Sequence, residues 1–229
     1  MNRSFRYQLR PTGRQTESLV ALLDVQRELY NAALEERIGA WKWERRSVPY
    51  FDQCRTLTGL REVRPDVLAW GVIVCRGTLK RLDRAFAAFY RRCRTGETPG
   101  FPRFKGKHRW DSVQWEDTAG WKISDAGRLY LQGVGHVKVN LHRPLRGVPK
   151  AITVKREGRR WYVSIRCVDV PAQPLPTTGR AVGVDRGITA LVATSDGELI
   201  ANERFGQRAA KRLVKAQQDL ARKKRGGGR

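Results

Sequence analysis

The spacing of the apolar residues changes near Gly96, and this change restricts the fold more than any other feature. Before Gly96, apolar residues recur every three or four positions, which is typical of amphipathic helices. After Gly96 they alternate between short glycine- and proline-rich turns, which is typical of strands. A helical first part followed by a β-rich second part predicts an α+β chain.

Two helices are expected before the change. Thr12 and Gln15 have capping-box spacing, so a helix should begin at about residue 13, directly after a short strand over residues 3–10, and end near Gly39. The clearest helix should begin around Pro65. One apolar stripe runs along it through Leu68, Val72, Cys75, Leu79, Leu82, Phe86 and Phe89.

Several short strands are expected after the change. Leu129, Leu131, Val137, Val139 and Leu141 alternate, and residues 152–167 form a hairpin pattern with its turn at Glu157 and Gly158. These strands predict a small β-barrel. A proline-rich linker over 171–176 precedes a second set of strands over 181–201, with a tight turn at Asp196 and Gly197, and a basic helix from Arg204.

Charge indicates the kind of partner. The 46 Lys and Arg residues exceed the 22 Asp and Glu residues, so the formal net charge is +24 and the pI is about 11.0. Such an excess opposes compaction unless a polyanion neutralises it, and nucleic acid is the usual polyanion. An anionic membrane surface is the alternative. It is disfavoured because the basic residues are spread along the whole chain and do not form one amphipathic helix.

Other function classes find little support. No stretch of about 18 apolar residues exists, and the first residues lack the apolar run of a signal peptide, so a cytoplasmic protein is expected. The four cysteines form no Cys-x-x-Cys pair, and the three histidines have no metal-ligand spacing with them, which predicts free thiols and no zinc site.

The candidate nucleic-acid-binding residues fall in three groups. On the second helix they lie off the apolar stripe, as a phosphate-facing surface: Arg76, Lys80, Arg81 and Arg84. In residues 100–107, where aromatic residues that could stack on bases or fill a core alternate with cations, they are Arg103, Lys105 and Lys107. Near the C-terminus they are Lys211, Arg212, Lys215, Arg222, Lys223, Lys224 and Arg225.

Asp185 is the carboxylate of most interest. It is expected at the end of a buried strand, between Gly183 and Gly187, which leave room beside it for a metal ion or a phosphate. Two-metal nucleases hold Mg²⁺ with such strand carboxylates, but one Asp cannot hold the metal pair. Taken alone, the residues favour a turn-forming Asp, and Asp196 is assigned to a hairpin turn.

Taken together, four stretches resemble the TnpB (OrfB) proteins of bacterial insertion sequences, which are RNA-guided DNA endonucleases with a RuvC-like nuclease domain. They are residues 5–12 (FRYQLRPT) with Gln15 and 29–34 (LYNAAL), residues 79–86 (LKRLDRAF), residues 100–107 (GFPRFKGK), and residues 182–188 (VGVDRGI) through 195–197 (SDG). Their order and spacing match the family over essentially the whole chain.

The resemblance implies an architecture and partners. Residues 1–12 and 96–178 would form a wedge-type β-barrel, residues 13–95 a helical recognition lobe inserted in it, and residues 179–229 the first strands and helix of a ribonuclease-H-like RuvC domain. Asp185 would be the first catalytic carboxylate and a Mg²⁺ ligand. The partners would be a guide RNA and double-stranded target DNA, with a separate transposase of the same element as a further candidate, in the bacterial cytoplasm near the nucleoid.

The resemblance also implies that family members continue beyond this chain. The further part would carry the second and third catalytic acids, a Glu and an Asp, and a Cys-x-x-Cys zinc ribbon. The expectation is therefore a chain truncated within its RuvC-like domain that does not cut DNA by itself. The alternatives are a nuclease-dead RNA-guided DNA-binding regulator and a decayed relic of a transposable element.

Overall fold

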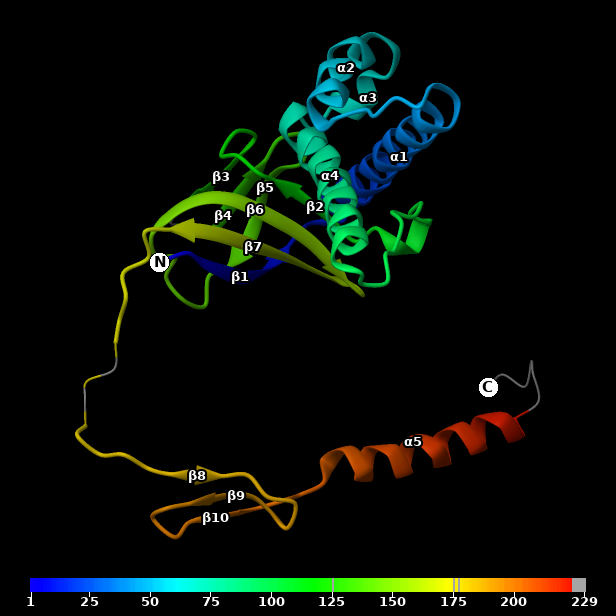
Figure 1. The fold of residues 1–229 in the computed structure, drawn as a ribbon. Helices are drawn as coiled ribbons and strands as arrows, with labels where there is room; N and C mark the ends of the chain where they lie inside the picture. Colours follow the sequence, from blue (N-terminus) through cyan, green and yellow to red (C-terminus); the bar gives the residue numbers. More distant parts are fainter. Residues whose placement is uncertain (125, 175, 177, 224–229) are drawn as a thin grey trace. The chain divides into compact units, whose positions relative to one another are not determined.

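The computed structural model describes residues 1–124, 126–174, 176 and 178–223, which form two units, residues 1–172 and 173–229 (Figure 1). Each unit is described by itself. Lys224 and Arg225, two of the expected nucleic-acid-binding residues, lie outside the described residues.

The first unit is α+β, as expected, and its helices precede most of its strands. It comprises strand β1 (Arg3–Arg10), helices α1 (Gly13–Glu44), α2 (Tyr50–Val63), α3 (Pro65–Leu68) and α4 (Val72–Thr95), the 3₁₀ turn η1 (Lys107–Arg109), and strands β2 (Ser112–Trp115), β3 (Trp121–Ser124), β4 (Arg128–Leu131), β5 (Gly135–Asn140), β6 (Val148–Glu157) and β7 (Arg160–Val168). The predicted hairpin is confirmed as β6 and β7, which pair antiparallel across a turn at Gly158, where φ is +58°.

The strands form one antiparallel sheet in the order β2-β6-β7-β1-β5-β4-β3. Seven strands about 4.8 Å apart would place the outer strands of a flat sheet about 29 Å apart. Yet the two outer strands, β2 and β3, are joined by only residues 116–120, which span about 20 Å at full extension. The sheet must therefore curl so that its two edges approach each other, and Figure 1 shows this curl.

Strand β1 joins the first residues of the chain to the end of the unit. It lies in the middle of the sheet, pairing with β5 through Leu9 and Val139 and with β7 through Phe5 and Ile165. The Met1 ammonium donates to the Val170 carbonyl at 3.0 Å, and the Val170 N–H donates back to the Met1 carbonyl at 3.0 Å. The helices between β1 and β2 are thus an insertion into one continuous sheet.

Helix α1 starts where the sequence predicts and ends later. Thr12 and Gln15 form the predicted capping box, because the Thr12 hydroxyl accepts from the Gln15 N–H at 3.3 Å and the Gln15 side chain accepts from the Thr12 N–H at 3.1 Å. The predicted end near Gly39 is wrong. One glycine costs a helix only about 1 kcal/mol, and the helix continues to Glu44, where Arg45 adopts a left-handed conformation and Arg46 donates its N–H to the Ala40 carbonyl.

The prediction of a single helix from Pro65 is wrong as well, because this segment forms two helices, α3 and α4. Gly71, at φ +89°, separates α3 from α4. The turn between β4 and β5 occupies the space beside this break, since a Cβ on Gly133 would come within 2.6 Å of the Trp70 ring. Helix α2 was not predicted, although Tyr50, Cys54, Leu57 and Leu60 recur at helical spacing and pack in or against the core. It packs on both α3 and α4.

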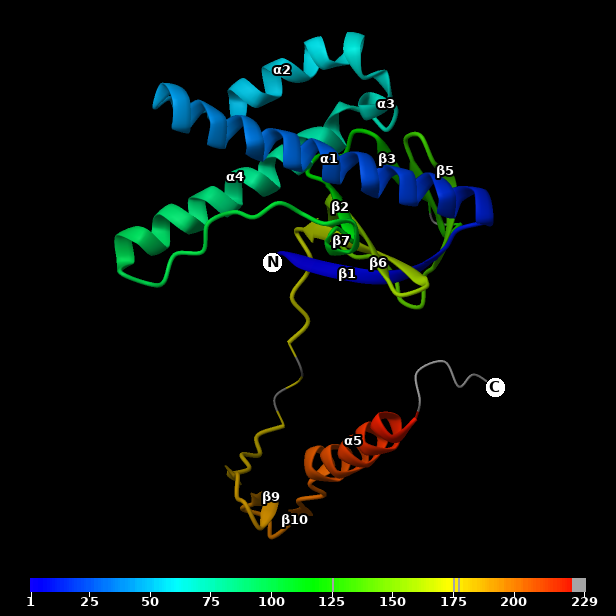
Figure 2. The same ribbon diagram turned by 90° about the vertical axis from the view of Figure 1, so that its right-hand side faces the viewer.

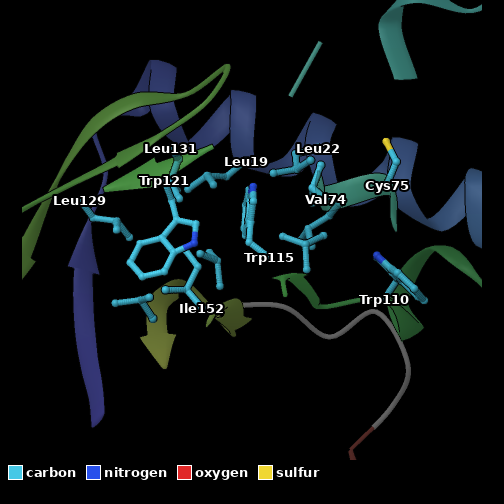
Figure 3. Close-up of a cluster of buried hydrophobic side chains, with 14 of the residues drawn as sticks. Leu19, Leu22, Val74, Cys75, Trp110, Trp115, Trp121, Leu129, Leu131 and Ile152 are labelled. Carbon is cyan, nitrogen blue, oxygen red and sulfur yellow. The ribbon is translucent and has the colours of Figure 1, made fainter. Parts of the chain in front are cut away.

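The core of the first unit lies between α1, α4 and the sheet. The three helices α1, α2 and α4 lie on one side of the curled sheet (Figure 2). Trp115 of β2 is fully buried and extends between Leu22 of α1 and Ile152 of β6, with Val74 of α4 beside it (Figure 3). One apolar cluster thereby joins the helical insertion to the sheet.

The second unit contains strands β8 (Val184–Asp185), β9 (Ala190–Thr194) and β10 (Leu199–Ala201), followed by helix α5 (Phe205–Arg222). The strands form an antiparallel sheet in the order β10-β9-β8, with the predicted turn at Gly197. No described residue from 173 to 223 is buried. The expectation of a buried strand before Asp185 is therefore wrong, because three short strands and one helix enclose too little volume to form a core.

No described helix is both long enough and apolar enough to cross a membrane.

Candidate nucleic-acid interface

The predicted cations of helix α4 differ in what they contact. Arg76 is exposed and forms no ion pair with a described carboxylate. Lys80 forms an ion pair with Asp83 at 3.1 Å and lies over the Tyr50 ring at 4.7 Å. Arg84 is exposed but pairs with Glu116 of the loop after β2 at 2.8 Å. Arg76 is the cation of this group that is most open to a phosphate.

Arg81 joins α4 to the sheet. Its guanidinium donates to the Ser112 carbonyl and hydroxyl, both at 2.9 Å, and lies 4.7 Å from the centre of the Trp110 ring. Burial lowers the pKa of Arg81, and the nearby Asp111 opposes this. A guanidinium held by two hydrogen bonds and a ring is a packing element of the core, so its expected role in phosphate binding finds no support in these contacts.

Arg103 and Lys105 lie in an irregular loop, and Lys107 is the first residue of η1, directly after it. Phe101 packs edge-on against Phe86 and Phe89 of α4, with ring centres 5.6 and 5.3 Å apart, while Phe104 is 54% exposed. Arg103 and Lys107 are exposed. The loop thus presents one free aromatic ring between two exposed cations.

Asn31 of α1 fixes this loop, and the sequence alone did not single it out as a binding or positioning residue. Its side-chain amide donates to the Lys105 carbonyl at 3.0 Å and accepts from the Lys105 N–H at 2.8 Å. Both backbone polar groups of Lys105 are thereby satisfied by one side chain, as a neighbouring strand would satisfy them. The Lys105 ammonium lies 5.8 Å from the centre of the Tyr30 ring and is partly buried.

Helix α5 carries the most open group of cations. Lys211, Arg212 and Lys215 are exposed, as are Arg222 at the helix end and Lys223 after it. At 100° per residue the side chains of Lys211, Arg212, Lys215 and Arg222 fall on one face with Arg208, while Leu213 and Leu220 lie on the other side of the helix. Arg208 is paired with Glu203 at 2.9 Å. The helix therefore presents a basic face long enough to follow several phosphates.

Asp185 lies in β8 and pairs with Ala193 of β9. The neighbouring Gly183 and Ser195 hold the two strands together, because the Gly183 N–H donates to the Ser195 hydroxyl at 2.9 Å and the Ser195 N–H donates to the Gly183 carbonyl at 2.9 Å. Asp185 is exposed. Asp196, assigned to a turn by its sequence, lies in that turn and is 4.0 Å from Arg180.

The described residues do not fit a magnesium pair at Asp185. In the part of the chain that the structure describes, no three His, Cys, Asp or Glu side chains gather where they could hold a metal ion. Mg²⁺ in a two-metal site needs more than one carboxylate. Asp185 alone therefore supports no metal-dependent step.

Comparison with known proteins gives consistent matches along the chain. Residues 1–46 match the family HTH_OrfB_IS605, described as a helix-turn-helix domain. Here these residues form β1 and the single long helix α1, so the match identifies relatives and the description does not fit the local structure.

Two relatives align with nearly the whole chain. A Streptomyces pristinaespiralis protein whose name proposes an RNA-guided DNA endonuclease is 33% identical over 99% of this chain and 56% of its own length. An Escherichia coli (strain K12) protein, InsQ, with the same proposed activity in its name, is 26% identical over 96% of this chain and 54% of its own length. The chain spans about half the length of these curated relatives.

Among solved structures, a Cas12f1 complex with single-guide RNA and target DNA covers 97% of this chain and 62% of its own, with a TM-score of 0.45 and 13% identity. At that level the similarity carries no functional inference. The match over residues 1–46 and the two relatives that align along nearly the whole chain identify this chain as a member of the TnpB (OrfB) family.

Proposed function

We propose that this chain is the nucleic-acid-binding part of a TnpB-type RNA-guided DNA endonuclease, and that it binds a guide RNA and DNA through their phosphates. The excess of cations carries the proposal. Even if every Asp and Glu paired with one Lys or Arg, 24 cations would have no carboxylate partner. The names of the two relatives favour RNA and DNA as the polyanions.

The proposal assigns a role to each region. Residues 1–12 and 96–178 form a wedge-type β-barrel, residues 13–95 the recognition lobe, and residues 179–229 the start of a RuvC-like nuclease domain. The pairing of β1 with β5 and β7 supports the first assignment, because it makes the helices an insertion into one sheet. Lys211, Arg212 and Lys215, together with Arg76 and Arg103, are the proposed phosphate-binding residues.

A salt titration tests phosphate binding. The affinity for single-stranded RNA should fall steeply with salt, with a log–log slope of about −0.7 per phosphate contact. Replacing Lys211, Arg212 and Lys215 with Gln should make that slope shallower by about 2 units. The matched control replaces Gln207, Gln217 and Gln218 of the same helix with Ala and should keep the slope. Binding that barely changes with salt would contradict the proposal.

Asp185 is the residue proposed for the nuclease site, on the strength of its strand and the family pattern around it. A second candidate function, RNA-guided DNA binding without cleavage, is favoured by one observation: no three His, Cys, Asp or Glu side chains gather at Asp185, or elsewhere among the described residues, where they could hold a metal ion. A cleavage assay distinguishes the two candidate functions. It combines the chain with the RNA that co-purifies with it, Mg²⁺, and DNA matched to that RNA. Cleavage lost in Asp185→Asn supports the nuclease, whereas tight binding with intact DNA supports the binder.

A further inference from the structure

The helical insertion contains a cavity of about 840 Å³ on the side of α4 that carries Phe89 and Tyr90. The end of α1, the turn over residues 45–49, α4 and Phe101 form its walls. Its volume falls within the range of about 300–1,000 Å³ that is usual for small-molecule sites. None of its residues was among the expected nucleic-acid-binding residues.

Aromatic rings line the cavity, and three of them are open to solvent. Trp41 is 56% exposed, Tyr90 is 55% exposed and Phe101 is 48% exposed, while Phe86 below them is 7% exposed. Phe101 and Phe86 meet edge-on, so the buried ring supports the exposed one. Large exposed rings gathered at one hollow mark a binding site, and flat ligands stack on them.

The rim of the cavity is basic. Lys42, Arg45 and Arg46 line it, against the single acid Asp83. Arg45 lies over the Trp41 ring at 5.9 Å from its centre, and its left-handed conformation at the end of α1 fixes its backbone. Arg46 is paired with Glu44 at 2.8 Å. Lys42 and Arg45 therefore remain for an anion beside the rings.

Arg37 provides an independent indication that a ligand binds here. Its side chain is 9% exposed, and its Nε donates to the Gln53 side chain at 2.8 Å. Its Nη2 lies 3.6 Å from the Asp83 carboxylate and has no hydrogen-bond partner among the described atoms. Asp83 thus neutralises Arg37 through a long ion pair, and an acceptor on a ligand in the cavity that Arg37 lines would give this buried Nη2 a shorter hydrogen bond.

We propose that this cavity binds one unpaired base of a single-stranded RNA segment, with the base stacked on Trp41, Tyr90 or Phe101 and a flanking phosphate at Lys42 and Arg45. The base edge supplies the acceptor for Arg37. The proposal rests on the proposed function in one respect, that the chain binds RNA, and it names where an unpaired base is held.

The positive charge of the cavity rim and the accessibility of unpaired bases favour a single-stranded RNA segment as the occupant of the cavity. A second copy of the chain would bring a further charge of +24 to a basic rim. A DNA duplex keeps its bases stacked inside, whereas folded RNA presents unpaired bases in loops and bulges that stack on aromatic side chains.

The test measures binding of a single-stranded RNA of about ten nucleotides to the full chain by fluorescence anisotropy. Trp41→Ala should weaken binding between about fivefold and a hundredfold, the range for loss of one stacked base, with an unchanged salt slope because no cation is removed. Tyr90→Ala should act in the same way, and Trp41→Phe should restore most of the affinity.

Trp43→Ala is the matched control, because Trp43 lies two residues away on the same helix, is 78% exposed and does not line the cavity. The Lys42 ammonium lies 4.7 Å from the centre of the Trp43 ring, and the substitution keeps the Lys42 charge. It should leave the affinity unchanged. Circular dichroism of each variant confirms folding, and Tyr90→Ala keeps the test informative if Trp41→Ala unfolds.

Three results would overturn the proposal while leaving phosphate binding intact: equal affinities for the parent chain and for both Trp41→Ala and Tyr90→Ala, equal losses for Trp41→Ala and Trp43→Ala, or a Trp41→Ala variant that changes only the oligomeric state. Equal binding and equal loss with the corresponding DNA strand would overturn the assignment to RNA. A parent chain that binds no RNA would instead refute the proposed function itself.

Discussion

The side-chain amide of Asn31 hydrogen-bonds both backbone groups of Lys105, 74 residues further along the chain. This contact holds the aromatic and basic loop over residues 100–107 against α1. A loop without regular structure otherwise has few means of fixing where its cations lie. The position of Arg103 and Lys107 therefore depends on a residue that touches neither.

Changing Asn31 should loosen this loop in a graded way. Asn31→Ala removes both hydrogen bonds and should lower the free energy of unfolding by about 1–3 kcal/mol. Asn31→Asp keeps the acceptor for the Lys105 N–H and loses only the donor. Amide hydrogen exchange at Lys105 should therefore speed up in Asn31→Ala and stay slow in Asn31→Asp. Equal exchange in both variants would contradict the two-bond contact.

Two glycines in helices should respond oppositely to alanine. Gly77 lies where α4 crosses β2, and a Cβ there would collide with the Gln114 carbonyl. Gly59 of α2 has open space around its Cβ position. We expect Gly77→Ala to destabilise by about 1–3 kcal/mol and Gly59→Ala to stabilise by up to about 1 kcal/mol, as measured by urea unfolding. A stabilising Gly77→Ala would refute the close crossing.

Arg81 and Arg76 lie five residues apart on α4. We expect Arg81 to act in packing and Arg76 to act in phosphate binding. Arg81→Lys keeps the charge and loses the paired hydrogen bonds to Ser112, so it should lower stability by about 1.5–3 kcal/mol without altering the salt slope of RNA binding. Arg76→Gln should alter the slope by about 0.7 and leave stability unchanged. Thermal unfolding and salt titrations of both variants distinguish the two roles. A changed salt slope for Arg81→Lys together with a loss of stability for Arg76→Gln would contradict the assignment.

Tyr50 should make stability depend on alkaline pH. Burial, and then the neighbouring Cys54 thiol, raise the pKa of Tyr50 from 10.0 to about 12. Because the folded state keeps the phenol protonated where the unfolded state loses the proton, the stability due to this shift is complete below pH 10 and is lost between pH 10 and 12. Tyr50→Phe has no phenol to titrate, so it should lose less stability over that interval.

Urea unfolding of the parent chain and Tyr50→Phe at matched pH values measures this difference. Parallel stability curves from pH 9 to 12 would show that Tyr50 is solvated in the folded state.

Local signals in the sequence were sufficient for many elements. The capping box of Thr12 and Gln15 and the hairpin turn at Gly158 depend on neighbouring residues, and the structure confirms both. The break at Gly71 was mispredicted because it lies beside a distant segment, where Trp70 and Gly133 meet. The end of α1 was mispredicted because the one glycine at position 39 costs a helix too little to stop it.

In the candidate site, too, some features follow from the local sequence and others depend on distant contacts. Arg81 and Arg84 look alike in sequence, yet only Arg81 meets Ser112 and Trp110, which no local pattern reveals. Trp41 and Arg45 lie in a segment rich in tryptophan and arginine, a usable local signal, yet neither was among the expected binding residues. The apolar residues around Asp185 in the sequence did not indicate that Asp185 is exposed. A pattern of alternating apolar residues predicts a strand, but it does not show how much other structure covers that strand.

The central place of β1 in its sheet has a consequence for biosynthesis. Met1 meets Val170 across 169 positions of the chain, and β1 finds no strand partner before β5 has been made. At about 5–20 residues per second, the ribosome needs roughly 10–30 s to supply β7. Strand β1 is thus the first strand to leave the ribosome and among the last to be paired on both sides in the sheet. Until then its apolar side chains have the newly synthesised α1 as their neighbour. We expect the helical insertion to fold first and to shelter β1 until the hairpin of β6 and β7 closes the sheet around it.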